Sequence, residues 1–284
     1  MPLLILRSTD IKRLENIDMN YIEQNSELIR FVCFVFAIVF FFLYEIFFPF
    51  YKKYKNNYSR LIINFLFIIV DAITVRILFP VLTIGAAVIC TKYNIGILNL
   101  LSLPLWFSII ISIFLLDLGI WLQHYIFHYN CIFWRFHKIH HSDYKLDFSS
   151  TLRFHPIEII VSIIIKSLYI FIIGAPILSV IIFEIILNGI SIYNHSNIYM
   201  PKKFELILRK ILVTPSMHRI HHSIIKKETN SNFGFIFSIW DKIFNTYCHI
   251  TYKEEKNLIM GLEEFHDIKN KSFLNLLTIP FKYK

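Results

Sequence analysis

The feature that most constrains this chain is a series of apolar stretches, each long enough to cross a lipid bilayer. Residues 29–50, 61–90, 98–122 and 157–192 are dominated by Ile, Leu, Phe and Val. A membrane-spanning helix needs about 20 consecutive apolar residues, and every stretch reaches this length. Together with a composition that is 56% hydrophobic and 17% charged, the four stretches predict an integral membrane protein.

Two of these stretches contain residues that interrupt a single span. Residues 61–90 include Pro80, so they form either one long tilted helix or a helix broken near the proline. Residues 157–192 are too long for one crossing and carry Gly-Ala-Pro at 174–176, which predicts a helical hairpin with its tip there. We therefore expect an all-α integral membrane protein with about four or five membrane-crossing helices.

The basic residues predict the orientation of the chain in the membrane. A net charge of +9 would suggest nucleic acid in a soluble protein, but Lys and Arg also accumulate in cytoplasmic loops of membrane proteins. We expect no nucleic-acid partner. If the basic segment 51–60 is cytoplasmic, then residues 123–156 and everything after residue 193 are cytoplasmic too. These two regions contain all twelve histidines, so we expect a cytoplasmic histidine-rich cap.

Eight histidines form three clusters with helical spacing. HYIFH at 124–128 places two histidines four residues apart, while HKIHH at 137–141 and HRIHH at 218–222 repeat the spacing i, i+3, i+4. On a helix, each cluster would share one face. Imidazole is a common ligand of iron, zinc, copper and nickel. Because one metal ion takes about three to six ligands, eight converging histidines indicate two ions.

A role other than binding two metal ions would involve only some of these histidines. An incidental pair or a basic amphipathic face would account for one cluster, and bis-histidine haem ligation would leave the two HxxHH repeats unused. The sequence has no HExxH, GxSxG, GxGxxG or P-loop motif. A zinc hydrolase needs fewer ligands around one open position. Two redox-active metal ions that activate O2 against a C–H bond would use all three clusters.

The motifs resemble those of the fatty acid hydroxylase/sterol desaturase superfamily. HYIFH, WRFHKIHHSDYKLDFSSTLRFHPIE, NHSNI and TPSMHRIHHS follow the family's order and spacing over about residues 100–250, and NFGFIFSIWDKIFNTY is similar to its closing segment. The resemblance implies two non-haem iron ions, a sterol, fatty acyl or ether lipid substrate, O2, and a separate ferredoxin or b-type cytochrome system as electron donor. It divides the chain into a polar arm (1–28), N-terminal transmembrane helices (29–97), a hydroxylase/desaturase-like domain (98–250) and a cytoplasmic tail (251–284).

The resemblance also implies a set of nine metal ligands: His124, His128, His137, His140, His141, His195, His218, His221 and His222. Some relatives have a tenth histidine where this chain has Tyr199, and a water held by Asn197 could fill that place. His155 could be a ligand or a partner of a ligand, or it could simply precede the helix that Pro156 is suited to begin.

Several acidic residues are candidates for supporting roles. Asp117 lies within an apolar stretch, where a carboxylate is costly and usually functional, and it could accept the second ring N–H of a ligand. Glu158, Asp143 and Asp241 are candidates for the same role. Asp71 and Arg76 either pair across a cavity or mark the end of a short span.

Several functions remain open at the level of sequence. The same scaffold could desaturate its lipid, or hydroxylate a carotenoid. A metal transporter or sensor without oxygen chemistry is the alternative from another class. A transporter would place its ligands near the membrane midplane, whereas these histidines follow the ends of the predicted spans, which favours the enzyme. The membrane, either a bacterial inner membrane or the endoplasmic reticulum, is not indicated.

Overall fold

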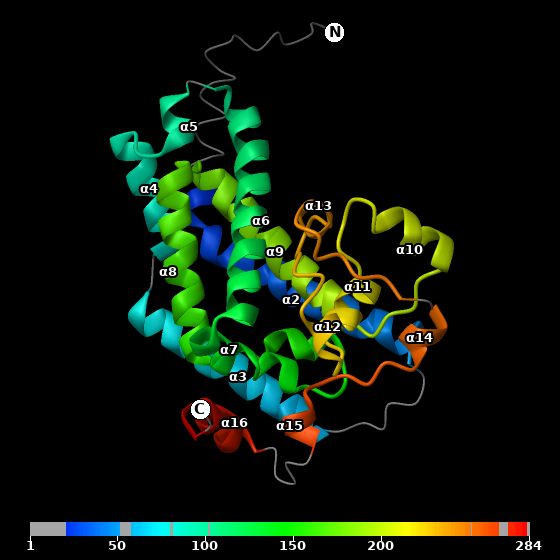
Figure 1. Cartoon of the computed structure of the whole chain (residues 1–284). Coiled ribbons are helices and arrows are strands. Elements are labelled where there is room, and N and C mark those ends of the chain that lie inside the picture. The colour runs from blue at the N-terminus through cyan, green and yellow to red at the C-terminus, as the bar shows by residue number, and fades with distance from the viewer. Residues whose placement is uncertain are drawn as a thin grey trace, which may run out of the picture.

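The computed structural model describes residues 21–51, 58–79, 82–101, 103–250, 252–266 and 272–282. Over these residues the chain is helical, with isolated β-bridges and no β-strand (Figure 1). Five segments are long and apolar enough to cross a membrane: 26–47, 58–100, 105–129, 156–173 and 177–195. The second of these runs across positions outside the described residues. The expected all-α integral membrane architecture is confirmed, and the number of candidate spans is five.

The first two spans form three helices. Helix α2 (Ser26–Phe47) corresponds to the first apolar stretch. The second stretch gives α3 (Tyr58–Leu78) and α4 (Leu82–Tyr93), so the broken helix is the correct one of the two predicted alternatives. Helix α3 ends at Leu78 and Phe79 is no longer helical, whereas Pro80 itself lies outside the described residues.

The third span lies further along the chain than its hydropathy predicted. A short helix α5 (Ile97–Leu100) precedes it, and α6 (Leu105–Tyr129) begins after Pro104 rather than at residue 98. A proline suits a helix start because its fixed φ and missing N–H cost nothing there. Because α6 continues to Tyr129, the two HYIFH histidines belong to its last two turns.

The predicted hairpin is confirmed as α8 (Pro156–Ile173) followed by α9 (Ile177–His195). Gly174 ends α8 with a φ of 71°, a left-handed conformation that favours glycine. A Cβ atom at Gly174 would also lie 2.6 Å from the carbonyl oxygen of Ile95, so the tip is closed against the loop before α5.

The remaining elements are shorter and lie mostly at the right and along the bottom of the molecule in the view of Figure 1. Between α6 and α8 they are α7 (Cys131–His137), η1 (His140–Ser142) and η2 (Phe148–Leu152). After α9 they are α10 (Lys202–Leu208), α11 (Pro215–His221), α12 (Lys226–Thr229), α13 (Ile239–Ile243), α14 (Tyr252–Lys256), α15 (Glu263–His266) and α16 (Phe273–Lys282).

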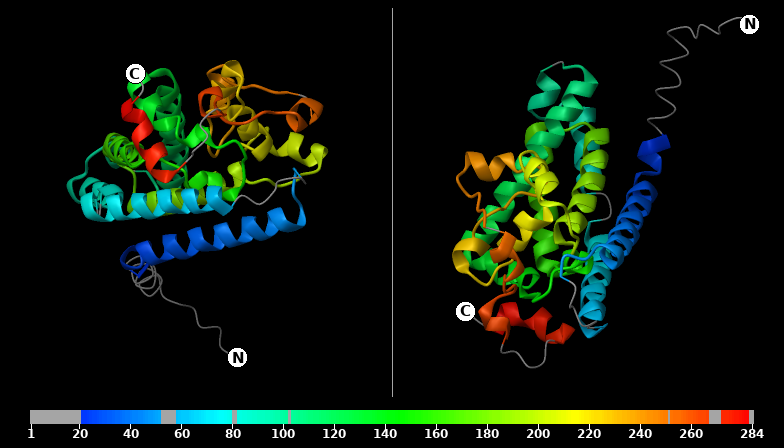
Figure 2. Two further views of the ribbon diagram at one scale, coloured as in Figure 1. Left: turned by 90° about the horizontal axis from the view of Figure 1, so that it is seen from below. Right: turned by 90° about the vertical axis from the view of Figure 1, so that its right-hand side faces the viewer.

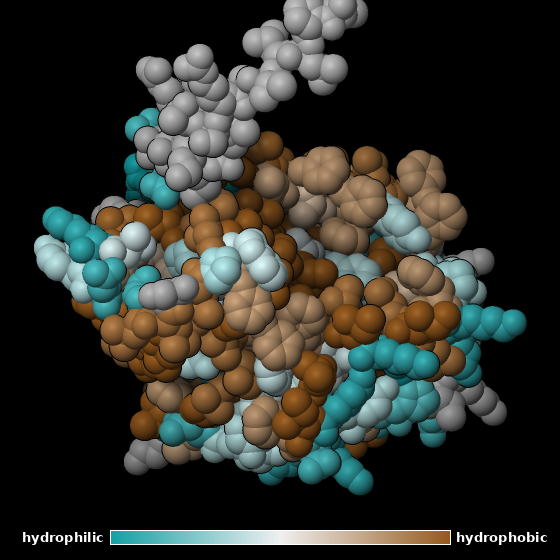
Figure 3. Space-filling model, turned by 90° about the horizontal axis from the view of Figure 1, so that it is seen from above, coloured by the Kyte–Doolittle hydropathy of each residue, from teal (hydrophilic) through white to brown (hydrophobic). Residues whose placement is uncertain are grey.

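The main apolar core lies between α4, α6, α8 and α9, where Leu116, Ile170 and Phe183 are buried. Helix α2 packs along α9, and α3 packs along α8 and η2 (Figure 2). Many large apolar side chains instead point outward, among them Phe36 and Phe47 of α2 and Ile77 of α3. Apolar residues cover much of the face seen from above, and hydrophilic residues gather near its edges (Figure 3). An outer surface of this kind suits contact with lipid chains.

Candidate metal centre

The first three histidines come from α6 and α7. His124 and His128 lie one turn apart near the end of α6, and both are buried. The chain then turns at Asn130, whose side-chain oxygen accepts hydrogen bonds from the backbone N–H groups of Ile132 (2.9 Å) and Phe133 (3.3 Å). This N-cap begins α7, and His137 is the last residue of that helix.

The two HxxHH motifs do not each form a single helical face. In the first, His137 ends α7, while His140 and His141 belong to the 3-10 turn η1. In the second, His218 and His221 lie on α11 and His222 is its C-cap residue. The expectation of one helix face per motif is therefore wrong for HKIHH, because the helix ends before the motif does.

The nine predicted ligands nevertheless converge, in two groups that cross the motif boundaries. One group contains His124, His128, His137, His141 and His221, and the other contains His140, His195, His218 and His222. Within each group the candidate ligand atoms all lie within 4.8 Å of one another. The groups are adjacent, since the rings of His141 and His222 stack with centroids 4.4 Å apart. Each HxxHH motif contributes to both groups.

The hydrogen bonds fix which ring nitrogens carry protons. The Nδ1 of His124 lies 2.8 Å from the carbonyl oxygen of Phe233, and a carbonyl can only accept, so this nitrogen carries the hydrogen. The Nδ1 of His137 likewise donates to Glu158 at 2.6 Å. Each Nε2 is then a bare acceptor, yet these two Nε2 atoms lie 3.1 Å apart. Two lone pairs at this distance repel unless a cation lies between them.

The same arrangement recurs in the second group. The Nδ1 of His195 donates to the carbonyl oxygen of Ser191 at 2.7 Å, and that of His140 faces the carbonyl oxygen of Arg153 at 3.3 Å. Their Nε2 atoms approach to 2.9 Å. Two ligands bound to one ion at about 2.1 Å and at right angles would be about 3.0 Å apart. The spacing in both groups therefore suits shared transition-metal ions.

Two further ring nitrogens, the Nε2 atoms of His128 and His221, are buried without a hydrogen bond among the described residues. The Nε2 atoms of His141, His218 and His222 lie 2.9–3.2 Å from the Nε2 of another histidine. An unpartnered buried acceptor is costly, so these nitrogens call for ions that coordinate them. Imidazole donors suit iron, zinc, copper or nickel rather than magnesium or calcium.

The surroundings keep these imidazoles neutral. Burial lowers the pKa of His137 to about 3. Burial first, and then repulsion from neighbouring histidines, lowers the pKa values of His140, His141, His218, His221 and His222 well below the usual value for histidine. All six are therefore neutral at physiological pH, which is the form that binds a metal.

Glu158 is the candidate carboxylate that contacts a ligand. It is only 4% exposed, and its Oε1 accepts from His137. Asp143 supports the site indirectly, through two arginines. Its carboxylate binds Arg60 at 2.7 Å and approaches Arg153 at 3.5 Å next to η1. Burial alone would raise the pKa of Asp143, but the two guanidinium groups hold it below its usual value. Arg60 and Arg153 are buried ion-pair partners, whereas the sequence indicated only that they are loop cations.

The structure contradicts the expected role of Asp117. Its carboxylate accepts hydrogen bonds from the backbone N–H of Ile236 (3.1 Å) and Phe237 (3.0 Å) and from the indole of Trp240 (2.9 Å), not from a histidine. Asp241 has a similar role, accepting from Trp121 at 3.0 Å and from the backbone of Phe233 at 2.8 Å. Both acids secure the 233–241 segment, whose carbonyl at Phe233 orients His124.

The expected role of Asn197 is not supported either. Its Oδ1 accepts from the backbone N–H of Tyr51 (2.9 Å) and its Nδ2 donates to the carbonyl of Tyr51 (3.2 Å), so it ties the loop after α2 to the end of α9. Tyr199 is 43% exposed and lies outside both histidine groups. His155 is the N-cap of α8, where its Nδ1 accepts from the backbone of Ile157 (3.1 Å), and it too belongs to neither group.

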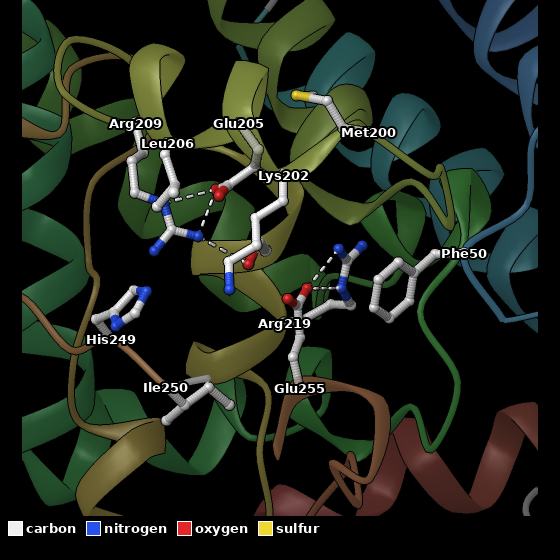
Figure 4. Close-up of a pocket in the computed structure, with 11 residues that line it drawn as sticks. Phe50, Met200, Lys202, Glu205, Leu206, Arg209, Arg219, His249, Ile250 and Glu255 are labelled. Atoms are coloured by element: carbon white, nitrogen blue, oxygen red, sulfur yellow. Dashed lines mark hydrogen bonds and ion pairs between the residues drawn. The ribbon is translucent and has the colours of Figure 1, made fainter. Parts of the chain in front are cut away.

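Two ion pairs, Arg219 with Glu255 and Arg209 with Glu205, lie beside α11 (Figure 4). Arg219 follows His218 directly, pairs with Glu255 at 2.6 Å, and lies with its guanidinium 4.1 Å from the ring centroid of Phe50. Arg209 binds Glu205 and donates to the hydroxyl of Ser216 at 2.9 Å. These buried contacts connect α10, α11 and α14, so the second HxxHH motif is presented by a rigid support.

Comparison with known proteins agrees with this arrangement. The family profile described as "Fatty acid hydroxylase" matches residues 109–246. The chain is 31% identical over 144 residues to an ornithine lipid hydroxylase of Rhizobium tropici, covering 51% of this chain and 43% of that protein. It is 30% identical over 149 residues to an alkylglycerol monooxygenase of Caenorhabditis elegans, covering 49% of this chain and 26% of the other. The human alkylglycerol monooxygenase is 29% identical over 164 residues, covering 58% and 35%.

The match thus spans less than half the length of each of these relatives. The region matched by the family profile includes all nine converging histidines, the carboxylate that holds His137, and the acids that secure the 233–241 segment. No solved structure matches the chain.

Proposed function

We propose that this chain, whose residues 109–246 match the fatty acid hydroxylase profile, is an integral membrane enzyme that hydroxylates a lipid C–H bond with O2 at a centre of two iron ions. The observation that carries the proposal is the convergence of nine buried imidazoles in two adjacent groups. When bound, iron supplies the redox chemistry that O2 activation requires. A single zinc ion would leave one of the two groups without a function.

The residues around the groups have distinct roles in this proposal. Glu158 and the carbonyl groups of Phe233, Ser191 and Ser231 hold the outer ring nitrogens of His137, His124, His195 and His221, and so direct the other nitrogens inward. The ring of Phe154 packs on His140 and the ring of Phe233 on His128, so apolar surface covers part of both groups. Excluding water protects a reactive oxidant and keeps the electrostatic interactions strong.

We favour hydroxylation over desaturation because the related proteins are named as a hydroxylase and as monooxygenases. Those names, together with the membrane spans, support a polar membrane lipid as substrate. Electrons would come from a separate ferredoxin or b-type cytochrome. We also propose that the histidines lie on the cytoplasmic side, because the basic segment 51–60 and the histidine-bearing regions fall on one side of the predicted spans.

The proposal is tested with the full chain, purified in mild detergent under low oxygen and loaded with ferrous iron. Ornithine lipid, an alkylglycerol and a fatty acid are each supplied with ferredoxin, its reductase and isotopically labelled O2. We expect one labelled oxygen atom in a lipid product, and none with a variant in which His140 and His221 are both alanine. A desaturated product would support the alternative outcome on the same scaffold. No lipid oxidation by an iron-loaded, reduced protein would contradict the proposal.

A further inference from the structure

A cavity of about 720 Å³ lies in the membrane-spanning part of the protein, beside the metal centre. It is lined by α2, α3, α4, α8 and α9 and by the segment 151–154. Its volume is in the range of binding sites for a small molecule or part of a lipid. Apolar side chains such as Ile68, Ile163 and Leu187 form much of its lining.

One end of the cavity is in direct contact with the second histidine group. The ring of Phe154, a lining residue, stacks on the ring of His140 with centroids 4.4 Å apart. Ser191, also in the lining, accepts the ring N–H of His195 at 2.7 Å through its backbone carbonyl. A molecule in this cavity would therefore be separated from two candidate ligands by single residues.

The cavity also contains charges where a membrane protein rarely places them. Lys166 of α8 donates to Glu184 of α9 at 2.8 Å, and Arg30 of α2 pairs with the same carboxylate. Lys166 lies ten residues beyond Pro156, about 15 Å along the helix, which is about halfway across a hydrocarbon layer of about 30 Å. Two cations share one carboxylate here, so the cluster has a net charge of +1 with all three groups ionised. Ionisable groups at such depth are usually functional.

A second, separate feature of the cavity is an unpartnered acid. Asp71 of α3 is only 5% exposed, lines the cavity, and has an Oδ1 atom without a hydrogen-bond partner among the described residues. The nearby Arg76 does not neutralise it, because Arg76 pairs with Glu27 at 3.1 Å. Glu23 is the one other charged residue in the lining. The cavity thus presents a carboxylate oxygen that lacks a donor, which an ammonium would satisfy most strongly, and a site with excess positive charge.

We propose that the cavity binds a lipid whose head group carries both an ammonium and an anionic group, the ammonium donating to Asp71 and the anion binding Arg30 and Lys166. The anion is a phosphate or a carboxylate, since both suit a guanidinium and an ammonium. A lipid without an ammonium could offer Asp71 only a neutral donor such as a hydroxyl, which binds a buried carboxylate less strongly than an ammonium does. That this lipid is also the substrate rests on the proposed function; the binding itself does not.

The test measures lipid binding by native mass spectrometry on the full chain in detergent, without metal or reductant. The probes are ornithine lipid (amine and carboxylate), phosphatidylethanolamine (amine and phosphate), phosphatidylglycerol (phosphate without amine) and diacylglycerol. We expect at least one amine-bearing lipid to bind about tenfold or more tightly than the other two, as for a buried ionic contact worth about 1.4 kcal/mol. Preference for one amine-bearing lipid over the other identifies the anion as phosphate or carboxylate.

Variants separate the head-group site from the fold. Asp71→Asn should lose the preference for amines, Asp71→Glu should keep most of it, and Lys166→Gln should weaken binding of both zwitterionic lipids. Glu264→Gln, which changes a half-exposed carboxylate (51%) paired with Lys138 and outside the cavity, is the matched control and should bind as the unmodified protein does. The Tm measured in parallel reports whether each variant is folded.

If neither amine-bearing lipid binds more tightly than phosphatidylglycerol and diacylglycerol, the inference is overturned. A folded Asp71→Asn variant with unchanged selectivity would overturn it too. This failure is distinct from failure of the proposed function. Selective binding without any oxidation would remove the function and leave the head-group site. Oxidation of uncharged lipids by the unmodified protein, without selective binding of either amine-bearing lipid, would keep the function and remove the site.

Discussion

Replacing Glu158 with glutamine removes one negative charge beside the metal centre and keeps the shape of the side chain. Glu158 is almost fully buried and accepts the Nδ1–H of His137 at 2.6 Å, so the carboxylate both fixes the ring and increases its basicity. A hydrogen bond to a charged group contributes about 1.5–3 kcal/mol, against about 0.5–1.5 kcal/mol for a neutral pair. The substitution should therefore cost about 1–2 kcal/mol of metal binding, which is about 5- to 30-fold in affinity.

The assay is a competition titration, in which ferrous iron is partitioned between the protein and a chelator under low oxygen. Glu264→Gln is the control, because it makes the same chemical change at a half-exposed carboxylate away from the histidines. We expect weaker iron binding in Glu158→Gln alone. Equal iron affinity in both variants and the unmodified protein would refute the assignment of His137 as a ligand held by Glu158.

Three further predictions follow from the same contacts. His195→Ala removes one of the four histidines of the second group, so iron should fall from about two ions per chain to about one; loss of both ions, or of neither, would show that the groups are not separate sites. Asp241→Asn breaks a buried network that includes Trp121 and the backbone of Phe233 and Gly234, and should lower the stability of the metal-free protein by about 2–4 kcal/mol, read as a lower Tm. Acid should also destabilise the metal-free protein, because histidine in the unfolded chain has a pKa near 6.5 whereas His137 in the folded chain has a pKa of about 3. The unfolded state therefore binds more protons below pH 6.5. For this residue, each pH unit below 6.5 lowers the free energy of unfolding by about 1.4 kcal/mol. An equal Tm at pH 7.5 and pH 5.5 would contradict the burial of neutral histidines.

The features that the sequence predicts correctly are those set by local pattern. Apolar length predicted the spans, and Gly-Ala-Pro at 174–176 predicted the hairpin tip, because a positive φ at Gly174 suits glycine and a proline suits the next helix start. Histidine spacing predicted eight of the nine histidines that converge, and the family resemblance added His195. The spacing did not predict how they divide, since that depends on where α7 ends: a helix that stops at His137 directs His140 to a different group from His137 and His141.

The roles of the other polar residues depend on contacts between distant parts of the chain. Asp117 lies on the α6 surface that meets the 233–241 segment, more than a hundred residues later, so its spacing to His124 was a poor guide to its partner. Asn197 pairs with Tyr51 in the same way. Arg60 and Arg153 are basic residues in polar surroundings by sequence, and only the packing of α3 against η1 and η2 brings both to Asp143.

The central claim, two iron ions held by two histidine groups, is tested most directly by metal content per chain. The protein is purified in mild detergent under low oxygen, and the unmodified chain is compared with the His140→Ala, His221→Ala double variant, which removes one histidine from each group. We predict about two iron ions per unmodified chain and their loss in the variant. A single zinc ion, or a metal content that does not change when these histidines are removed, would contradict the account.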